Sequence, residues 1–187
     1  MRISLLLSFC LCLSVLSYGA TKPKNTRLVT DEKVVYPTPP VSPLSLFYVQ
    51  RNTNTNTIIY DLNYTSDGKL DASEPVKVYW IRYAEDSSRK DLSYIQRKFA
   101  YGLTSKALAN GNYDIRFVSY KKFPLTLMKT EDGKYHIFAL IAQKKVMLNR
   151  IFVKINGGTL WLPSVTYVEV KVVYLGIGKE RGERFKP

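Results

Sequence analysis

The sequence predicts a mainly β fold, either an antiparallel β-sandwich or a small closed β-barrel of about eight strands with one short α-helix. Beyond residue 43, apolar and polar side chains alternate with a period of two, which is typical of half-buried strands. Pairs that favour tight turns, such as Asp132-Gly133, separate these segments. The sequence has no βαβ rhythm and no internal repeat, which favours antiparallel pairing.

The N-terminus has the layout of a secretory signal peptide. Arg2 supplies a positive start, residues 3–16 are almost wholly apolar, and Ser17 to Ala20 are mostly small. We expect cleavage after Gly19. The apolar run is shorter than the roughly 20 residues that span a bilayer, so no transmembrane span is expected after cleavage. The protein is therefore predicted to be exported, with the periplasm, the cell surface and the medium left open.

Cysteine usage and charge narrow the function classes. Cys10 and Cys12, the only cysteines, lie in the signal segment, so disulfides, thiol catalysis and thiolate metal sites are excluded for the mature chain. The net charge of +13 predicts an anionic envelope component, an acidic polysaccharide or an acidic protein as partner, and disfavours nucleic acid outside the cytoplasm. Solubility alone also accounts for this charge, and the oligomeric state is left open.

Composition divides the chain into four segments. After the signal segment the chain is polar and rich in proline, which fixes φ and removes backbone donors, so a disordered tether is expected there. We assign a signal peptide to 1–19, a tether to 20–43, a single β-domain to 44–175 and a basic C-terminal tail to 176–187.

Strand patterns occur at 45–51, 57–64, 76–84, 113–120, 124–130, 134–142, 146–156 and 165–175. In the second of these, Ile58, Tyr60 and Leu62 share one face. The third is apolar on both faces apart from Lys77 and Arg82, which indicates a central strand.

One helix fits between the third and fourth strands. Leu92, Ile95 and Phe99 fall on one apolar stripe, Asp91 or a neighbouring serine can cap the helix, and Gly102 can end it.

Three stretches of the predicted β-domain carry a resemblance. They are 75–86, 92–102 with its closing Ala-Tyr-Gly, and 131–135. Together they resemble an uncharacterised family of exported bacterial domains, a domain of unknown function, over roughly residues 44–174. The resemblance implies a bacterial envelope or secreted setting. It brings no established activity, so no functional residue is carried over.

Residues suited to catalysis are sparse. His136 is the only histidine, and a serine or cysteine triad needs a histidine base, so we interpret it as a structural strand residue. A glycosidase would need two carboxylates facing one groove. Asp61, Asp86, Asp91 and Asp114 are candidates, although each fits a turn, a cap or a polar strand face equally well. The sequence therefore favours a non-enzymatic protein with no catalytic residue, metal ligand or cofactor.

Aromatic residues form the first candidate binding group. The chain contains 14 Tyr, 8 Phe and 2 Trp. Tyr79, Trp80 and Tyr83 share one strand, where alternation places Tyr79 and Tyr83 on one side and Trp80 on the other. Such residues pack β cores by default, and in a barrel one side would line a cavity.

Turn lysines form the second candidate group. If 113–175 is a simple meander, the turns at Lys121-Lys122 and Lys144-Lys145 fall at the same end, because two strands separate them. The basic tail would return to the same rim. Clustered lysines attract phosphate or carboxylate groups, although turn lysines are also commonly just solvated.

These features predict an exported non-enzymatic β-domain that binds a ligand or partner, anionic in character, through the lysine-rich rim or an aromatic-lined pocket. Two alternatives stay open. One is a small integral outer-membrane β-barrel, against which several strands are shorter than the roughly 9–11 residues that a span requires. The other is a carbohydrate-active hydrolase that uses paired carboxylates.

Overall fold

The structure is a computed structural model that describes residues 34–159, 162–174, 178 and 180–186. The predicted signal peptide, its cleavage site and most of the predicted tether lie outside these residues. No helix within the described ranges has the length and apolar character needed to cross a membrane. The fold described below belongs to the compact unit that begins at Val35.

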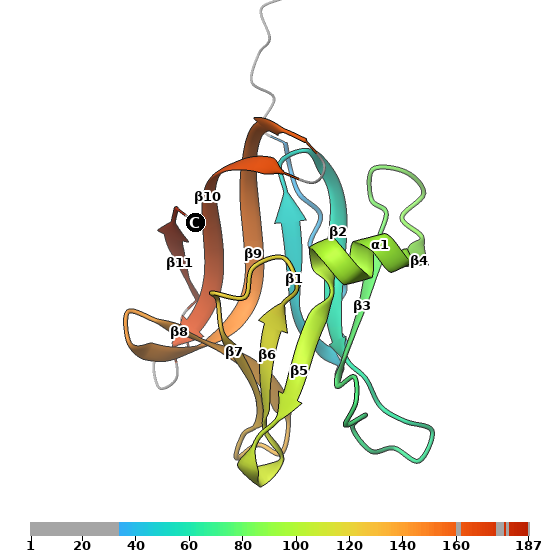
Figure 1. The fold of residues 1–187 in the computed structure, drawn as a ribbon, viewed down its shortest axis with the longest axis vertical. Helices are drawn as coiled ribbons and strands as arrows, with labels where there is room; N and C mark the ends of the chain where they lie inside the picture. The colour runs from blue at the N-terminus through green and yellow to red at the C-terminus, as the bar shows by residue number, and fades with distance from the viewer. Residues whose placement is uncertain (1–33, 160–161, 175–177, 179, 187) are drawn as a thin grey trace, which may run out of the picture. The chain divides into compact units, whose positions relative to one another are not determined.

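The described chain is mainly β, as predicted, and its sheet curls into a half-barrel (Figure 1). The strands are β1 (Ser45–Arg51), β2 (Asn54–Leu62), β3 (Val76–Ile81), β4 (Arg89–Asp91), β5 (Leu103–Ala107), β6 (Tyr113–Phe117), β7 (Leu125–Lys129), β8 (Tyr135–Ile141), β9 (Lys144–Gly158), β10 (Pro163–Tyr174) and β11 (Glu180–Phe185). Each of the eight predicted strand segments overlaps one of these. The strands β4, β5 and β11 were not predicted, and they bring the number in the described chain to eleven.

The long strand β9 organises the sheet. One edge of β9 pairs with β10 over most of its length. The other edge pairs first with β8, over residues 144–147, and then with β1, over residues 150–153. The strand order therefore runs β4-β3-β2-β1-β9-β8-β7-β6-β5, with β10 and β11 beyond β9. The sheet forks at β9 into two wings, β1–β4 and β5–β8.

The pairing of β1 with β9 is parallel, whereas the prediction was antiparallel throughout. The other strand pairs in the described sheet are antiparallel. Side-chain alternation tells which residues share a face but carries no information about strand direction, so the sequence could not reveal this pair.

The inner faces of the two wings pack together to form the core. The rings of Phe47 in β1 and Tyr60 in β2 stack 4.2 Å apart, and Phe117 of β6 meets both edge-on. Alternate residues of β7 and β9, including Leu127 and Leu148, are completely buried beside them. The two-residue period read from the sequence therefore selects the core face correctly.

The predicted helix is present as α1 (Tyr94–Gln96), which continues as a π-helical turn, η1 (Arg97–Tyr101). Ser93 caps it, and its side chain and that of Gln96 form a reciprocal capping box. Gly102 ends the π-helical turn, and a Cβ at this position would lie 1.9 Å from the carbonyl oxygen of Arg97. The serine cap and the terminal glycine are both as predicted.

The apolar stripe of this helix does not enter the core. Leu92 is buried, but Ile95 and Phe99 keep exposed fractions of 49% and 54%. The segment packs against the core through half-buried Tyr101 at its C-terminal end, so its first residues are more exposed. A short 3₁₀ turn, η2 (Ala109–Gly111), follows β5.

The described parts of the predicted tether and of the predicted basic tail both contact the sheet. In the predicted basic tail, β11 pairs with β10, and the ion pair of Arg184 with Glu169 joins the two strands. In the predicted tether, the carbonyl of Pro37 accepts a 2.7 Å hydrogen bond from the buried side chain of Gln50. The ring of Tyr36 also packs edge-on against Phe152 of β9.

Candidate functional site

A cavity of about 840 Å³ lies against the inner face of β9 and β10. Its floor consists of alternate apolar residues of the two strands, among them Ile151, Val153, Val168 and Val170. These side chains share one face because they are spaced two apart along each strand. The length of β9 is what makes the floor, since the strand continues past the point where β8 ends.

The other side of the cavity is built from η1 and the loop between β6 and β7. Tyr101 comes from the last turn of η1, and Tyr120 and Phe123 come from the loop. The ring of Phe123 lies 5.8 Å from that of Phe185 in β11, so the loop and the last strand meet at one end of the cavity. Figure 1 shows β11 at the outer edge of β10.

Arg51 is the single charged side chain among the described lining residues. Its guanidinium lies 5.1 Å from the ring of Trp80 and 5.3 Å from that of Tyr101, and its Nη1 donates a hydrogen bond to the Tyr101 hydroxyl. Its Nε is buried and makes no hydrogen bond. Among the described residues no carboxylate pairs with Arg51, so its positive charge faces two aromatic rings and one phenol oxygen.

Hydrogen bonds fix the position of Tyr101. The hydroxyl of Tyr60 donates a 2.9 Å hydrogen bond to the carbonyl of Tyr101, and the ring of Trp80 meets that of Tyr101 edge-on. Complete burial raises the pKa of Tyr60 well above its ordinary value, so the hydroxyl stays protonated as a donor. Burial also raises the pKa of Tyr101, an effect opposed by the charge of Arg51.

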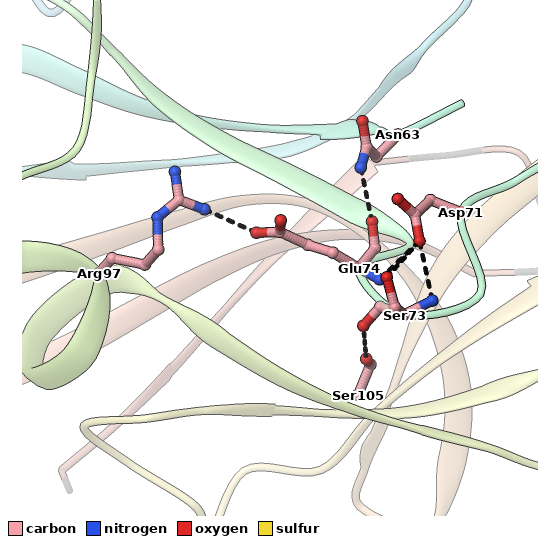
Figure 2. Close-up of polar contacts among 6 residues, drawn as sticks. All are labelled: Asn63, Asp71, Ser73, Glu74, Arg97 and Ser105. Atoms are coloured by element: carbon pink, nitrogen blue, oxygen red, sulfur yellow. Dashed lines mark hydrogen bonds and ion pairs between the residues drawn. The ribbon is translucent and has the colours of Figure 1, made fainter. Parts of the chain in front are cut away.

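A polar network connects the β2–β3 loop to the helix and to β5 (Figure 2). Within it, Arg97 of η1 forms a 2.6 Å ion pair with Glu74, and the Ser105 hydroxyl of β5 donates to the carbonyl of Ser73. Asp71 accepts hydrogen bonds from the hydroxyl of Ser73 and from the backbone amides of Glu74 and Ser73, and these bonds lower its pKa. The network therefore connects one wing, at the β2–β3 loop, to the other wing, at β5, and to η1.

The structure places the predicted aromatic group on both faces of β3. The Tyr79 hydroxyl is bound to Asp61 on the outer face, and Tyr83 follows on that side, where burial and nearby Tyr48 raise its pKa. Trp80 points inward and contacts Arg51. The predicted alternation is therefore observed for Tyr79 and Trp80. None of the three residues lines the cavity, although Trp80 contacts the lining residues Arg51 and Tyr101.

The predicted lysine rim falls on two turns of the meander. Lys121 and Lys122 lie in the β6–β7 loop, and Lys144 and Lys145 begin β9 after its hairpin with β8. Both turns are at the same end of the strands, as the predicted meander requires. Their contacts differ, because the carbonyl of Lys121 accepts from Arg116 while the ammonium of Lys145 lies 3.8 Å from the sulfur of Met128. Figure 1 shows the β8–β9 hairpin at the left and the β6–β7 loop near the middle.

The candidate carboxylates have different surroundings. Asp61 is bound to Tyr79, Asp86 accepts from Ser88, and Asp114 pairs with Arg116. Asp91 is exposed at the end of β4. His136 makes a 3.3 Å contact with Asp132 in the β7–β8 hairpin. None of these residues lines the cavity, and the described lining contains no histidine, carboxylate or lysine.

Sequence reasoning missed the most distinctive residue of the site, although its signal was present. Phe47 and Val49 alternate on the inner face of β1, and Arg51 continues that same face. A charged residue in the register of a buried apolar face is costly and suggests a function. Tyr101 had no sequence signal beyond its place in the Ala-Tyr-Gly that closes the helical segment.

Comparison with known families gives one match. A family model described as a domain of unknown function (DUF4833) matches residues 47–184, a range that contains β1 to β11 almost completely. This confirms the resemblance to an uncharacterised family, while the exported setting remains a prediction. The searches of curated proteins and of solved structures gave no match.

Proposed function

The chain belongs to the family described as a domain of unknown function (DUF4833), and we propose that it is an exported, non-enzymatic domain that binds a hydrophobic ligand in the cavity beside β9 and β10. Export is supported by the signal-like N-terminus of the sequence.

The observation that carries the proposal is the combination of cavity size and lining. A volume of about 840 Å³ falls in the range of roughly 300–1,000 Å³ that small-molecule pockets occupy. Such pockets are mostly apolar with a few placed polar groups, which describes this lining of valine, isoleucine and aromatic side chains around Arg51. Since the described lining contains no histidine, carboxylate, lysine or cysteine, binding without chemical conversion is the function that we propose.

The pocket accounts for ligand binding better than the lysine rim. Its residues line one concave volume, whereas Lys121 and Lys145 contact different neighbours. Apolar burial also supplies more binding free energy than solvated turn lysines, whose interactions weaken in physiological salt.

A substitution that fills the cavity tests the proposal. Val168 lines the floor in β10, so Val168→Trp should occupy ligand space. Val173 lies on the same strand and does not line the cavity, so Val173→Trp is the matched control. We expect the purified protein to bind the neutral dye Nile red saturably, with affinity reduced tenfold or more by Val168→Trp and changed less than threefold by Val173→Trp.

Thermal unfolding of both variants checks that each still folds cooperatively. Absence of saturable dye binding by the unmodified protein, or equal binding by the two tryptophan variants, would contradict the proposal.

A further inference from the structure

We propose that the ligand of this cavity is a single-chain amphiphile whose anionic head group is bound by Arg51 and Tyr101 and whose hydrocarbon chain lies against β9 and β10. The inference rests on the proposed function, since it specifies which hydrophobic ligand the cavity takes. The head group is a carboxylate or a phosphate, which the test below separates.

The position of Arg51 is the first argument. It follows Phe47 and Val49, both buried, on the inner face of β1, and it pairs in register with Val153 of the cavity floor. Moving a guanidinium out of water is costly unless an anion or several hydrogen bonds compensate. The fold nevertheless holds this charge at the wall of an apolar cavity.

The partners of Arg51 supply only part of that compensation. Four other arginines of the described chain pair with carboxylates, for example Arg97 with Glu74 and Arg116 with Asp114, although the buried Nε of Arg150, like that of Arg51, makes no hydrogen bond. Arg51 instead meets two aromatic rings and one phenol oxygen, and its Nε makes no hydrogen bond. An anion entering the cavity would therefore find a guanidinium whose charge no carboxylate of the described residues has neutralised.

Tyr101 provides a second donor at the same place. Its hydroxyl oxygen accepts the hydrogen bond from Arg51, which leaves its own proton available to a ligand. The backbone of Tyr101 is held by Tyr60, and its ring by Trp80, so the donor is preorganised. A guanidinium beside a phenol matches the oxygens of a carboxylate or a phosphate.

The remainder of the lining is suited to a hydrocarbon chain. Beyond Arg51 the described cavity wall carries no charge, and Ile151, Val153, Val168 and Phe185 supply apolar surface from three strands. An inorganic anion would leave this surface unused, and an uncharged lipid would leave Arg51 without a counter-charge. An amphiphile with one charged end satisfies both parts of the cavity.

The test compares ligands of the same chain length and different heads. Palmitate, hexadecyl phosphate and hexadecanol, each below its aggregation limit, compete with Nile red for the purified protein. We expect at least one of the two anions to bind tenfold or more tightly than the alcohol, because a charge-assisted hydrogen bond strengthens binding by about this factor. The tighter anion identifies the head group.

Substitutions show which residues cause the preference for the anion over the alcohol. Arg51→Met keeps an apolar stem of similar reach and removes the charge, so the anion should bind no more tightly than hexadecanol. Tyr101→Phe should reduce the preference partially. The matched control is the double variant Lys121→Gln with Lys122→Gln, which removes two charges from the β6–β7 loop and should leave the preference intact.

The outcomes separate the two proposals. If Nile red does not bind, the proposed function fails. If it binds, but the anions and the alcohol compete equally, or the preference survives Arg51→Met, or it follows the two lysines, then cavity binding stands and the assignment of an anionic head group to Arg51 is overturned.

Discussion

The hydroxyl of Tyr79 donates a 2.7 Å hydrogen bond to Oδ2 of Asp61, and both side chains are 92% buried, with exposed fractions of only 8%. Tyr79 stands diagonally across the β2–β3 ladder from Asp61, since it is registered with Ile59. The guanidinium of Arg89 lies 3.6 Å from the Tyr79 ring centroid. Oδ1 of Asp61 is buried without a hydrogen bond, so the Tyr79 hydroxyl provides the one hydrogen bond of this side chain in the described structure.

Removing that hydroxyl should destabilise the fold. In Tyr79→Phe the carboxylate of Asp61 stays buried with both oxygens unpartnered, which lowers the free energy of unfolding by about 1–3 kcal/mol. Urea denaturation followed by circular dichroism measures it. Tyr83→Phe, on the same side of the strand, removes a hydroxyl with no hydrogen bond in the described structure and is the control. Equal effects of the two substitutions would contradict the assigned role of the pair.

Tyr79 should also make stability depend on alkaline pH. Burial, and then the hydrogen bond to Asp61, raise the pKa of Tyr79 to about 12 from its ordinary value of 10. Because the pKa is higher in the folded state, the stabilising contribution is complete below pH 10 and is lost as the pH rises from 10 to about 12. Thermal unfolding across this window should show a steeper loss in the unmodified protein than in Tyr79→Phe. Parallel pH profiles would refute the prediction.

Gly102 should not tolerate a side chain. A Cβ would lie 1.9 Å from the carbonyl oxygen of Arg97, so Gly102→Ala must displace the end of η1. We expect a loss of about 1–3 kcal/mol in stability, as for other overpacked positions, together with weaker Nile red binding because Tyr101 moves. Gly182→Ala in β11 is the control, since its Cβ would meet no atom within 4 Å. Undiminished stability of Gly102→Ala would show that the close approach is absent in solution.

Asp132 should contribute to stability at neutral pH and lose that contribution in acid. The hydroxyl of Thr130, the backbone amide of Lys134 and the side chain of His136 lower its pKa to about 2. Since the folded pKa is the lower one, the contribution is present above about pH 3.8 and is lost as the pH falls toward 2. Asp132→Asn should therefore lower the melting temperature at neutral pH and flatten its decline over this range. Glu131→Gln, at an exposed neighbour without a side-chain hydrogen bond in the described chain, should leave the profile unchanged.

Local patterns predicted the parts of the fold that depend on local chemistry. Alternation in β2 separates buried Ile58 and Tyr60 onto the core face, and the Asp132-Gly133 turn forms as expected, with Gly133 at a φ of +78°. The serine cap at Ser93 and the stop at Gly102 follow from hydrogen-bonding capacity and steric room, which a sequence displays directly.

Contacts between segments that are far apart in the chain could not be predicted from local patterns. Arg51 and Tyr101 lie fifty residues apart in the chain and meet only because the helix crosses the inner face of β1 and β2. The strand β11 is highly charged, and it pairs because β10 leaves an edge open, a circumstance that no pattern within 180–185 reveals. The cavity depends on the meeting of Arg51 with Tyr101 and on the pairing of β11 with β10. The sequence therefore predicted a pocket in general terms without identifying its residues.

The parallel pair of β1 and β9 joins Tyr48 to Arg150, roughly one hundred residues further along the chain, and contacts between such distant segments close slowly. While the chain is being synthesised, β1 can acquire one neighbour early, in β2, and must wait for its second until most of the polypeptide has emerged. A fragment ending before β9 would therefore expose a naked strand edge, prone to aggregation, and would lack the wall against which a guest molecule could lie.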